Sequence, residues 1–301
     1  MNSPSRPIVF GEVLFDRFPD GSEVLGGAPF NVAWHLAGFG LDPLLITRIG
    51  QDEPGERVLA AMRAHGLDTA GVQRDPAAPT GAVEVRLGEA GPGFEIAPDQ
   101  AFDRIEGARA LAALAGVRPS LLYHGTLAAR APASADALAA LRAAVDAPRF
   151  VDVNLRAPWW SREDVIELCA GAAVVKLNDD ELLALDDGPA DAIGARAARF
   201  RERVGSDWLI VTRGADGALL LDGRSEPLAR RPQGGTRVVD TVGAGDAFSA
   251  VAIAGRLGGW PAGRTLERAV AFAAWICEIR GAVPRDRTLY DRALAAWQET
   301  A

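Results

Sequence analysis

A glycine-rich turn followed by an acid lies late in the sequence, in VVDTVGAGDAFSA at residues 238–250. A Gly-X-Gly turn that leads into a helix presents backbone N–H groups and the positive end of the helix dipole, which together bind anions. Asp246 would repel a phosphate bound there, so its presence predicts a role in the reaction. A carboxylate that takes the proton of an attacking hydroxyl, while the helix N-terminus holds the transferring phosphoryl group, fits that role. An acidic helix start is the structural alternative.

A second group of polar and flexible residues lies near the N-terminus, in GGAPFN at residues 26–31. The paired glycines Gly26 and Gly27 let a ligand or another backbone segment approach closely. The amide of Asn31 offers donors and an acceptor that suit sugar hydroxyls. The structural alternative is a tight turn in which Asn31 caps the following helix.

Other phosphate-binding motifs are missing from the sequence. There is no G-x-x-x-x-G-K-[ST], and the single lysine, Lys176, follows two valines rather than a glycine loop. As a dinucleotide fingerprint, the run that starts at Gly243 ends in Phe248 where glycine or alanine is needed. These observations argue against a P-loop NTPase and a Rossmann oxidoreductase.

Composition and charge limit the class of protein. The chain has 301 residues, of which 49% are hydrophobic, so one large α/β domain can bury a sizeable core. The formal net charge of −8 provides no electrostatic basis for binding nucleic acid or an anionic membrane. Cys169 and Cys277 lack metal-ligand spacing. No signal-peptide pattern or transmembrane run is found, so we expect a cytoplasmic protein.

Short apolar runs alternate with alanine-rich stretches, which predicts an α/β fold with a mostly parallel sheet covered on both faces. The expected strands are 8–10, 44–49, 120–123, 149–155, 173–177, 208–212 and 217–221. The expected helices are 30–39, 55–65, 107–115, 133–146, 161–170, 191–204, 245–258, 263–280 and 288–299. Residues 12–25 and 80–98 alternate polar and apolar side chains with Gly and Pro turns. These two segments predict a small antiparallel sheet inserted as a lid into a single domain.

The ordered set of motifs resembles the ribokinase-like (PfkB-type) sugar kinases over nearly the whole chain. GGAPFNVAWHLAGFG and DTVGAGDAF are similar to the two signature regions of that family. Gly11 with Asp16, DVNLRAPWW, KLNDDEL, VTRGADG and IRGAVP follow in the expected order, and GGAP, the NLR–W stretch and FEIAPDQAFDRI most resemble the fructokinase branch. The resemblance implies a three-layer fold with a β lid that transfers the γ-phosphoryl group of ATP to a sugar hydroxymethyl group, with D-fructose as the first candidate.

The resemblance also implies roles for residues in the reaction and in sugar binding. Asp246 matches the catalytic base, and Arg156 matches the arginine that neutralises phosphate charge during transfer; both also match substrate-binding positions. The backbone of Gly243, Ala244 and Gly245 matches the anion hole. The other sugar-binding positions are matched by Asp16, Gly26, Gly27 and Asn31.

Nucleotide and metal roles follow from the same resemblance. Asn178 and Glu181 match a pair that organises Mg²⁺ through water, and their i, i+3 spacing would place them on one helical face. Asp240 matches the loop that binds a monovalent cation, although Arg285 stands where a neutral residue is expected, so activation by K⁺ stays open. The nucleotide-binding positions are matched by Thr212, Gly214 and Gly217, together with Asn178, Gly243 and Gly245.

Besides activation by K⁺, three questions stay open at the level of sequence. The acceptor can be D-fructose, 2-keto-3-deoxygluconate, ribose or a nucleoside, because acceptor choice depends on a few pocket contacts. A sugar-binding regulator without catalysis belongs to a different class, and the intact Asp246 and Arg156 argue against it. A homodimer formed through the lid is implied by the resemblance alone.

Overall fold

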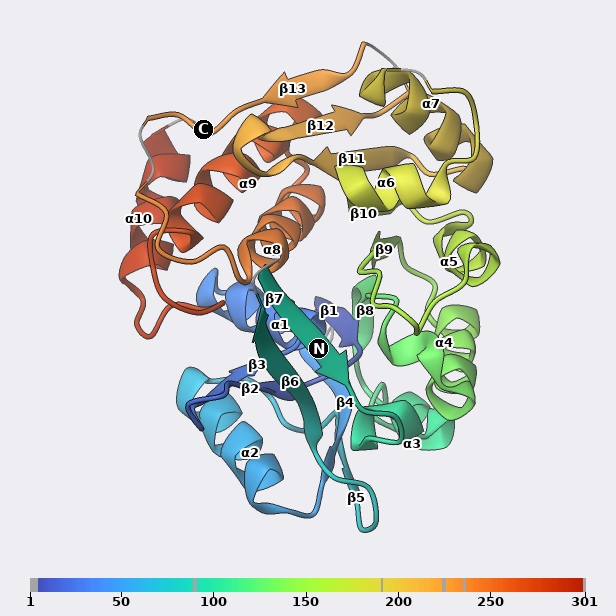
Figure 1. Ribbon diagram of the computed structural model, residues 1–301, viewed down its shortest axis with the longest axis vertical. Coiled ribbons are helices and arrows are strands. Elements are labelled where there is room, and N and C mark those ends of the chain that lie inside the picture. The colour runs from blue at the N-terminus through green and yellow to red at the C-terminus, as the bar shows by residue number, and fades with distance from the viewer. Residues whose placement is uncertain (1–4, 89–90, 191, 224–225, 235–236, 300–301) are drawn as a thin grey trace.

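A large, mostly parallel sheet forms the centre of the computed structural model, which describes residues 5–88, 91–190, 192–223, 226–234 and 237–299. Parallel pairing runs without interruption over seven neighbouring strands, and the two strands at one edge are antiparallel. In spatial order the strands are β13 (Leu228–Arg230), β12 (Ala218–Leu221), β11 (Trp208–Thr212), β10 (Val174–Asn178), β9 (Arg149–Asp152), β8 (Arg118–His124), β1 (Ser5–Phe10), β4 (Leu44–Gly50) and β5 (Val72–Asp75) (Figure 1).

The central strands are apolar on both faces because helices cover both sides of the sheet. All seven residues of β4 are buried, and alternate residues of β1 enter different clusters of the core, Val9 on one face and Ile8 and Phe10 on the other. The expected α/β fold with a mostly parallel sheet is thereby confirmed. The strands β5 and β13 were not expected from the sequence, because VQRD is short and largely polar and LAR has only three residues.

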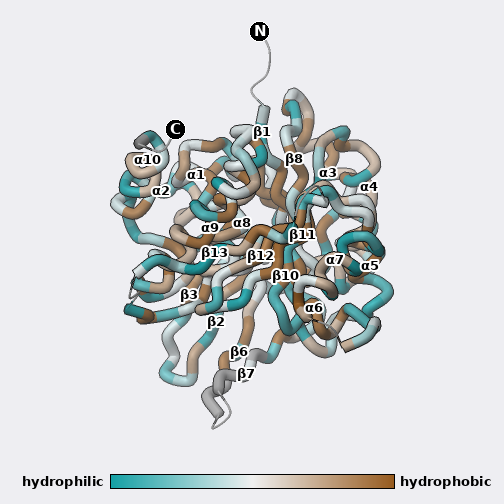
Figure 2. The backbone as a smooth tube through the Cα atoms, turned by 90° about the horizontal axis from the view of Figure 1, so that it is seen from above, coloured by the Kyte–Doolittle hydropathy of each residue, from teal (hydrophilic) through white to brown (hydrophobic). Residues whose placement is uncertain are grey.

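Two layers of helices enclose the large sheet, and hydrophobic residues concentrate between the layers (Figures 1 and 2). One layer consists of α1 (Ala28–Gly38), α2 (Glu53–His65), α8 (Ala244–Leu257), α9 (Ala262–Ile276) and α10 (Thr288–Glu299). The other consists of α3 (Gly107–Ala112), α4 (Pro132–Ala144), α5 (Arg162–Cys169), α6 (Asp179–Leu185) and α7 (Ile193–Val204). Within the described ranges, no helix combines the length and the apolar character needed to cross a membrane.

A second, smaller sheet extends from one side of the body, where β6 and β7 protrude in Figure 2. Its strands, in spatial order, are β3 (Glu23–Gly26), β2 (Leu14–Arg17), β6 (Gly81–Gly88) and β7 (Gly91–Ile96). The pairs β2–β3 and β6–β7 are antiparallel as expected, whereas β2 and β6 pair in parallel. This central pair joins two hairpins from separate parts of the chain, so no tight turn forces it to be antiparallel.

Two boundaries of the large fold differ from the sequence expectation in a way that matters for the site. The strand expected at 149–155 ends at Asp152, so the residues that follow leave the sheet at its carboxyl edge. The helix expected at 263–280 ends at Ile276, and the chain then turns back toward the N-terminus of α8, where the Cys277 carbonyl accepts hydrogen bonds from the N–H groups of Val239 and Asp240.

Candidate active site

A cleft of about 790 Å³ lies where the carboxyl ends of the parallel strands, the small sheet and the N-terminus of α8 meet. Ligands of open α/β sheets bind at this edge, because the loops after the strands converge there. The residues that line the cleft include eleven that were expected from the sequence: Asp16, Gly27, Asn31, Arg156, Asn178, Glu181, Thr212, Asp240, Gly243, Gly245 and Asp246. Gly26 precedes Gly27 at the end of β3, and Ala244 is the first residue of α8.

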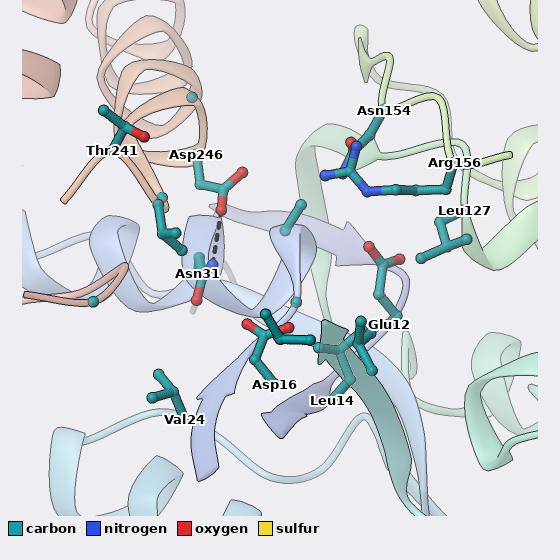
Figure 3. Close-up of a pocket in the computed structure, with 18 of the residues that line it drawn as sticks. Glu12, Leu14, Asp16, Val24, Asn31, Leu127, Asn154, Arg156, Thr241 and Asp246 are labelled. Atoms are coloured by element: carbon teal, nitrogen blue, oxygen red, sulfur yellow. Dashed lines mark hydrogen bonds between the residues drawn. The ribbon is translucent and has the colours of Figure 1, made fainter. Parts of the chain in front are cut away.

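Asp246 and Asn31 meet across the two helices whose first turns border the cleft. The Asn31 amide donates a hydrogen bond from Nδ2 to Oδ2 of Asp246 over 2.7 Å (Figure 3). Burial raises the pKa of Asp246 to about 7, an effect that Asp152 reinforces and that Asn31, Lys176 and Arg156 oppose. A carboxylate whose pKa lies near neutrality can accept a proton from an attacking hydroxyl. The helix-cap alternative for Asn31 does not apply, because Gly27 is the N-cap of α1.

The glycines before Asp246 allow the N-terminus of α8 to face the cleft. Gly243 caps the helix with φ of 78°, and a methyl group there would lie 2.4 Å from Cα of Ala282, so only glycine fits. The N–H of Ala244 donates to the Thr241 carbonyl over 3.3 Å, a long hydrogen bond. Gly245 lines the cleft, next to the positive end of the helix dipole.

A buried cation lies beside this helix terminus, and sequence reasoning did not find it. Lys176 donates from Nζ to Oδ1 of Asp152 over 2.7 Å, with the Lys176 side chain only 7% exposed. Ser249 and Tyr123 donate to the other oxygen of Asp152 over 2.6 and 3.2 Å. Burial opposes the charge of Lys176, but Asp152, with smaller contributions from Asp246 and Glu181, raises its pKa above the usual range.

The position of this ion pair explains why it belongs to the site. Both Lys176 and Asp152 line the cleft, and a methyl group on Gly245 would lie 3.4 Å from Nζ. The sequence did contain a signal, a single lysine inside the mostly apolar strand VVKLN. Burying a lysine costs free energy unless its charge is paired, so this position predicts a partner for it.

Arg156 and Asp16 reach the cleft from different parts of the fold. Arg156 lies in the loop after β9, and Asp16 lies in β2 of the small sheet. Arg156 is exposed, and its guanidinium points into the same space as the carboxylates of Asp16 and Glu12 (Figure 3). Burial raises the pKa of Asp16 to about 6, and Arg156 opposes this. Glu12, which precedes β2, was not singled out in the sequence although it lines the cleft.

Of the paired glycines at residues 26 and 27, only Gly27 is required by close packing. A methyl group on Gly27 would lie 2.7 Å from the carbonyl oxygen of Glu12, and Gly27 has φ of 104°. A methyl group on Gly26 would lie 3.5 Å from Oδ2 of Asp16. Gly27 therefore lets the start of α1 approach the backbone of Glu12, whereas the contact at Gly26 is an ordinary van der Waals distance.

Asn178 and Glu181 form a capping box at the start of α6, in which Asn178 is the N-cap and Glu181 lies three residues later on the same side of the helix end. Oδ1 of Asn178 accepts from the Glu181 N–H, and Oε2 of Glu181 accepts from the Asn178 N–H, each over 2.8 Å. Oε1 of Glu181 accepts from the Leu155 N–H over 3.1 Å. Burial raises the pKa of Glu181, and the two backbone hydrogen bonds oppose this.

This arrangement limits how a metal ion can be held. Among the described residues, no group of three or more His, Cys, Asp and Glu side chains is placed to ligate one. Mg²⁺ commonly keeps several of its waters and uses one or two carboxylates together with substrate phosphates. The pair Asn178 and Glu181 fits such a water-mediated site better than direct coordination.

The remaining expected nucleotide and cation residues occupy two loops. Asp240 accepts hydrogen bonds from the N–H groups of Val242 and Gly281 over 3.0 and 2.9 Å, so its carboxylate ties these two loops together beside the cleft. Thr212 lines the cleft at the end of β11. Gly214 and Gly217 lie in the turn between β11 and β12, and Gly217 packs against the Arg230 carbonyl, 1.9 Å from where a methyl group would lie.

Comparison with known families identifies the chain. The model of the pfkB family of carbohydrate kinases matches residues 8–288, so the chain belongs to that family and is a carbohydrate kinase of the fructokinase-like kind. It is 31% identical to a fructokinase of Klebsiella pneumoniae over 264 residues, covering 82% of this chain and 83% of the relative. It is 28% identical to fructokinase-2 of Oryza sativa subsp. japonica over 266 residues, covering 81% and 78%.

Solved structures share the fold over all or nearly all of the chain. A fructokinase from Xylella fastidiosa with bound ATP has a TM-score of 0.84 at 21% identity and covers 100% of this chain and 99% of its own. A fructokinase from Vibrio cholerae, bound to fructose, ADP and calcium ion, has a TM-score of 0.79 at 23% identity, with 97% and 99% covered. At these identities the likeness concerns the fold.

Proposed function

We propose that this pfkB-family kinase transfers the γ-phosphoryl group of MgATP to the hydroxymethyl group of a sugar, with D-fructose as the acceptor. The observation that carries the proposal is Asp246, a carboxylate with a pKa of about 7 at the mouth of a helix whose N-terminus attracts anions. Such a carboxylate weakens phosphate binding, so its presence is best explained by a role as general base.

The reaction follows from the charges around the cleft. The acceptor hydroxyl binds beside Asp246, which is oriented by Asn31, and loses its proton to the carboxylate as its oxygen attacks the γ-phosphorus of ATP. The bond from phosphorus to the β,γ-bridging oxygen breaks, and ADP leaves. The N-terminus of α8 and Arg156 stabilise the charge on the transferring group. Lys176 adds a positive charge beside Gly245, and its pairing with Asp152 holds it in place.

The metal and cation roles are part of the same proposal. Mg²⁺, when bound with the nucleotide, neutralises charge on the β- and γ-phosphates. Asn178 and Glu181 would hold its waters, and both line the cleft. Asp240 would support a monovalent cation such as K⁺, because it joins the loop before α8 to Gly281 and so couples cation binding to the anion site. Thr212, with Gly214 and Gly217 in the adjacent turn, would border the nucleotide.

The small sheet would act as a lid over the sugar within one kinase domain. It carries Asp16, which faces the cleft, and the chain continues directly from β3 into Gly27 and Asn31. Closing over the acceptor would exclude water and suppress ATP hydrolysis. The outer strands β3 and β7 are edges to which a second copy could pair as a homodimer. Dependence on ATP favours the cytoplasm as the place of action.

D-fructose is chosen because the named relatives above are fructokinases, and the GGAP, NLR–W and FEIAPDQAFDRI segments support the same choice. The alternatives are 2-keto-3-deoxygluconate, ribose or a nucleoside, which would use the same transfer chemistry. A non-catalytic sugar-binding regulator is disfavoured, since Asp246, Arg156 and Gly243 are all intact in the cleft.

A panel of acceptors incubated with MgATP, with ADP release followed by a coupled assay, tests the proposal. D-fructose should be phosphorylated with the highest kcat/KM, and a control without sugar should release little ADP. Turnover of ribose or ketodeoxygluconate without turnover of fructose would keep the kinase and reject the fructokinase. No turnover with any acceptor would reject the kinase activity.

A further inference from the structure

One buried carboxyl group in the cleft is not used by the transfer chemistry described above. Glu12 is only 2% exposed and lies in the link between β1 of the large sheet and β2 of the small sheet. Its Oε2 is buried and has no hydrogen-bond partner among the described residues, although Glu12 lines the cleft. Buried polar atoms in folded proteins are nearly always paired, so an unpaired oxygen at a ligand cleft indicates that the ligand supplies the partner.

The backbone on both sides of Glu12 is tightly packed, so Glu12 differs from a mobile acidic side chain on the surface. Gly11 has φ of 149° and packs against Pro29, where a methyl group would lie 2.4 Å from Cγ. Gly27 packs against the carbonyl oxygen of Glu12 itself, 2.7 Å from where a methyl group would lie. The backbone that carries the buried Glu12 side chain is therefore held in place before any ligand binds, which favours a selective contact.

The charges near Glu12 select the kind of ligand group. Burial raises the pKa of Glu12 to about 7 and Asp246 reinforces this, whereas a hydrogen bond from the Glu12 backbone and the charges of Arg156 and Arg130 oppose it. Near neutral pH the group can therefore accept a hydrogen bond or, when protonated, donate one. A neutral hydroxyl suits both states, whereas a phosphate would be repelled by the ionised form.

Figure 3 shows where on the acceptor this contact would fall. The Asp246–Asn31 pair lies on one side of the view, and Glu12 lies on the other, below Arg156 and beside Leu14 and Leu127. We propose that Glu12 hydrogen-bonds a hydroxyl of the acceptor other than the one that is phosphorylated, and that it thereby determines which acceptors are used. This inference rests on the proposed function, since it concerns the acceptor of that reaction.

The test removes the same hydrogen bond in two ways, by substituting Glu12 in the protein and by deleting single hydroxyl groups from the sugar. Wild type, Glu12→Ala and Glu12→Gln are assayed with D-fructose and with its monodeoxy analogues, each lacking one hydroxyl that is not phosphorylated. Wild type should prefer fructose over one particular analogue by roughly 10²-fold in kcat/KM, because loss of a partner leaves Glu12 unpaired. In Glu12→Ala that preference should fall to within about threefold, while the preferences over the other analogues and the KM for ATP stay close to wild type.

The conservative variant and a matched control separate binding from folding. Glu12→Gln keeps a donor and an acceptor, so it should retain most of the preference. Asp16→Ala should lose a preference for a different hydroxyl, because its carboxylate enters the cleft from another position. If Glu12→Ala does not fold, loss of part of the single-analogue preference in Glu12→Gln carries the test. Equal loss of activity with every acceptor and with ATP, or unchanged preferences in both variants, would overturn the inference.

Calorimetric binding keeps this inference distinct from the proposed function. If wild type phosphorylates none of the sugars, the kinase proposal fails. Binding of fructose and the deoxy analogues to wild type and Glu12→Ala still reports on Glu12. A wild-type preference that disappears in the variant supports the contact, and identical affinities in the two proteins reject it.

Discussion

Replacing Asp246, the carboxylate that we propose as the general base, should make this protein more stable and should remove most of its activity. Asp246→Asn keeps the shape of the side chain and an oxygen that can accept from Asn31 Nδ2. It removes a charge that burial opposes, since the pKa of Asp246 is raised from 3.8 to about 7. We expect kcat to fall by roughly 10²–10⁴-fold, the usual range for loss of a general base.

The stability gain has a defined pH dependence. An acid whose pKa is raised by folding is neutral in both states at low pH, and it destabilises the folded state as pH rises from its unfolded to its folded pKa. The gain of the variant should therefore be small below about pH 4 and complete above about pH 7. At about 1.36 kcal/mol per pKa unit, a pKa raised from 3.8 to about 7 corresponds to at most about 4 kcal/mol.

The expected size is reduced because Asp246 is partly exposed to the cleft. We expect about 2–3 kcal/mol, since solvent in the cleft lowers the cost of the charge. The entropy of unfolding is roughly 2.1 cal/mol/K per residue, so for 301 residues the melting temperature should rise by about 3–5 °C.

Calorimetric melting without ligands at about pH 5 and about pH 8.5 measures this gain, and the coupled assay measures turnover. Asp136→Asn, the same charge change at an exposed position of α4 outside the cleft lining, is the matched control and should change neither quantity. A variant that melts at or below the wild-type temperature at the higher pH would refute the inference that desolvation makes the charge of Asp246 destabilising. Near-normal turnover would refute the general base.

Three further expectations concern the groups around this carboxylate. Arg156→Ala should lower kcat by roughly 10³-fold, with partial rescue by lysine, which lacks the planar guanidinium; an unchanged rate would make it an ordinary surface arginine. The acid limb of the pH profile of kcat/KM should follow the pKa of Asp246. Lys176→Met leaves the charge of Asp152 uncompensated and should move this limb to higher pH, whereas Asp152→Asn should move it to lower pH. Shifts in the same direction in pH–rate measurements would contradict this electrostatic account. Asp16→Ala should raise KM for the sugar by roughly 10–100-fold and leave KM for ATP nearly constant in steady-state kinetics, and equal increases would argue against a sugar contact.

The glycine turn and the helix that begins at Ala244 were predictable from sequence because they depend on neighbours in the chain. A glycine turn, an acid and an apolar helix within VVDTVGAGDAFSA predict an anion site with a base, since backbone N–H groups and the helix dipole arise from local structure. The alternation of apolar runs with helical stretches likewise predicted the layers and the mostly parallel sheet. The strands β5 and β13 were missed because pairing with neighbouring strands, rather than a pattern in their own short segments, holds them in the sheet.

The groups that tune this site depend on contacts between distant segments, which no local pattern contains. Lys176 and Asp152 are 24 residues apart and pair only because β9 and β10 are neighbours in register. Asn31 and Asp246 are separated by 215 residues, and their hydrogen bond requires α1 and α8 to pack together. The raised pKa of Asp246 and the unpaired oxygen of Glu12 follow from burial. Residue types determined which chemistry was available, and tertiary packing decided which groups are desolvated, paired or left for a ligand.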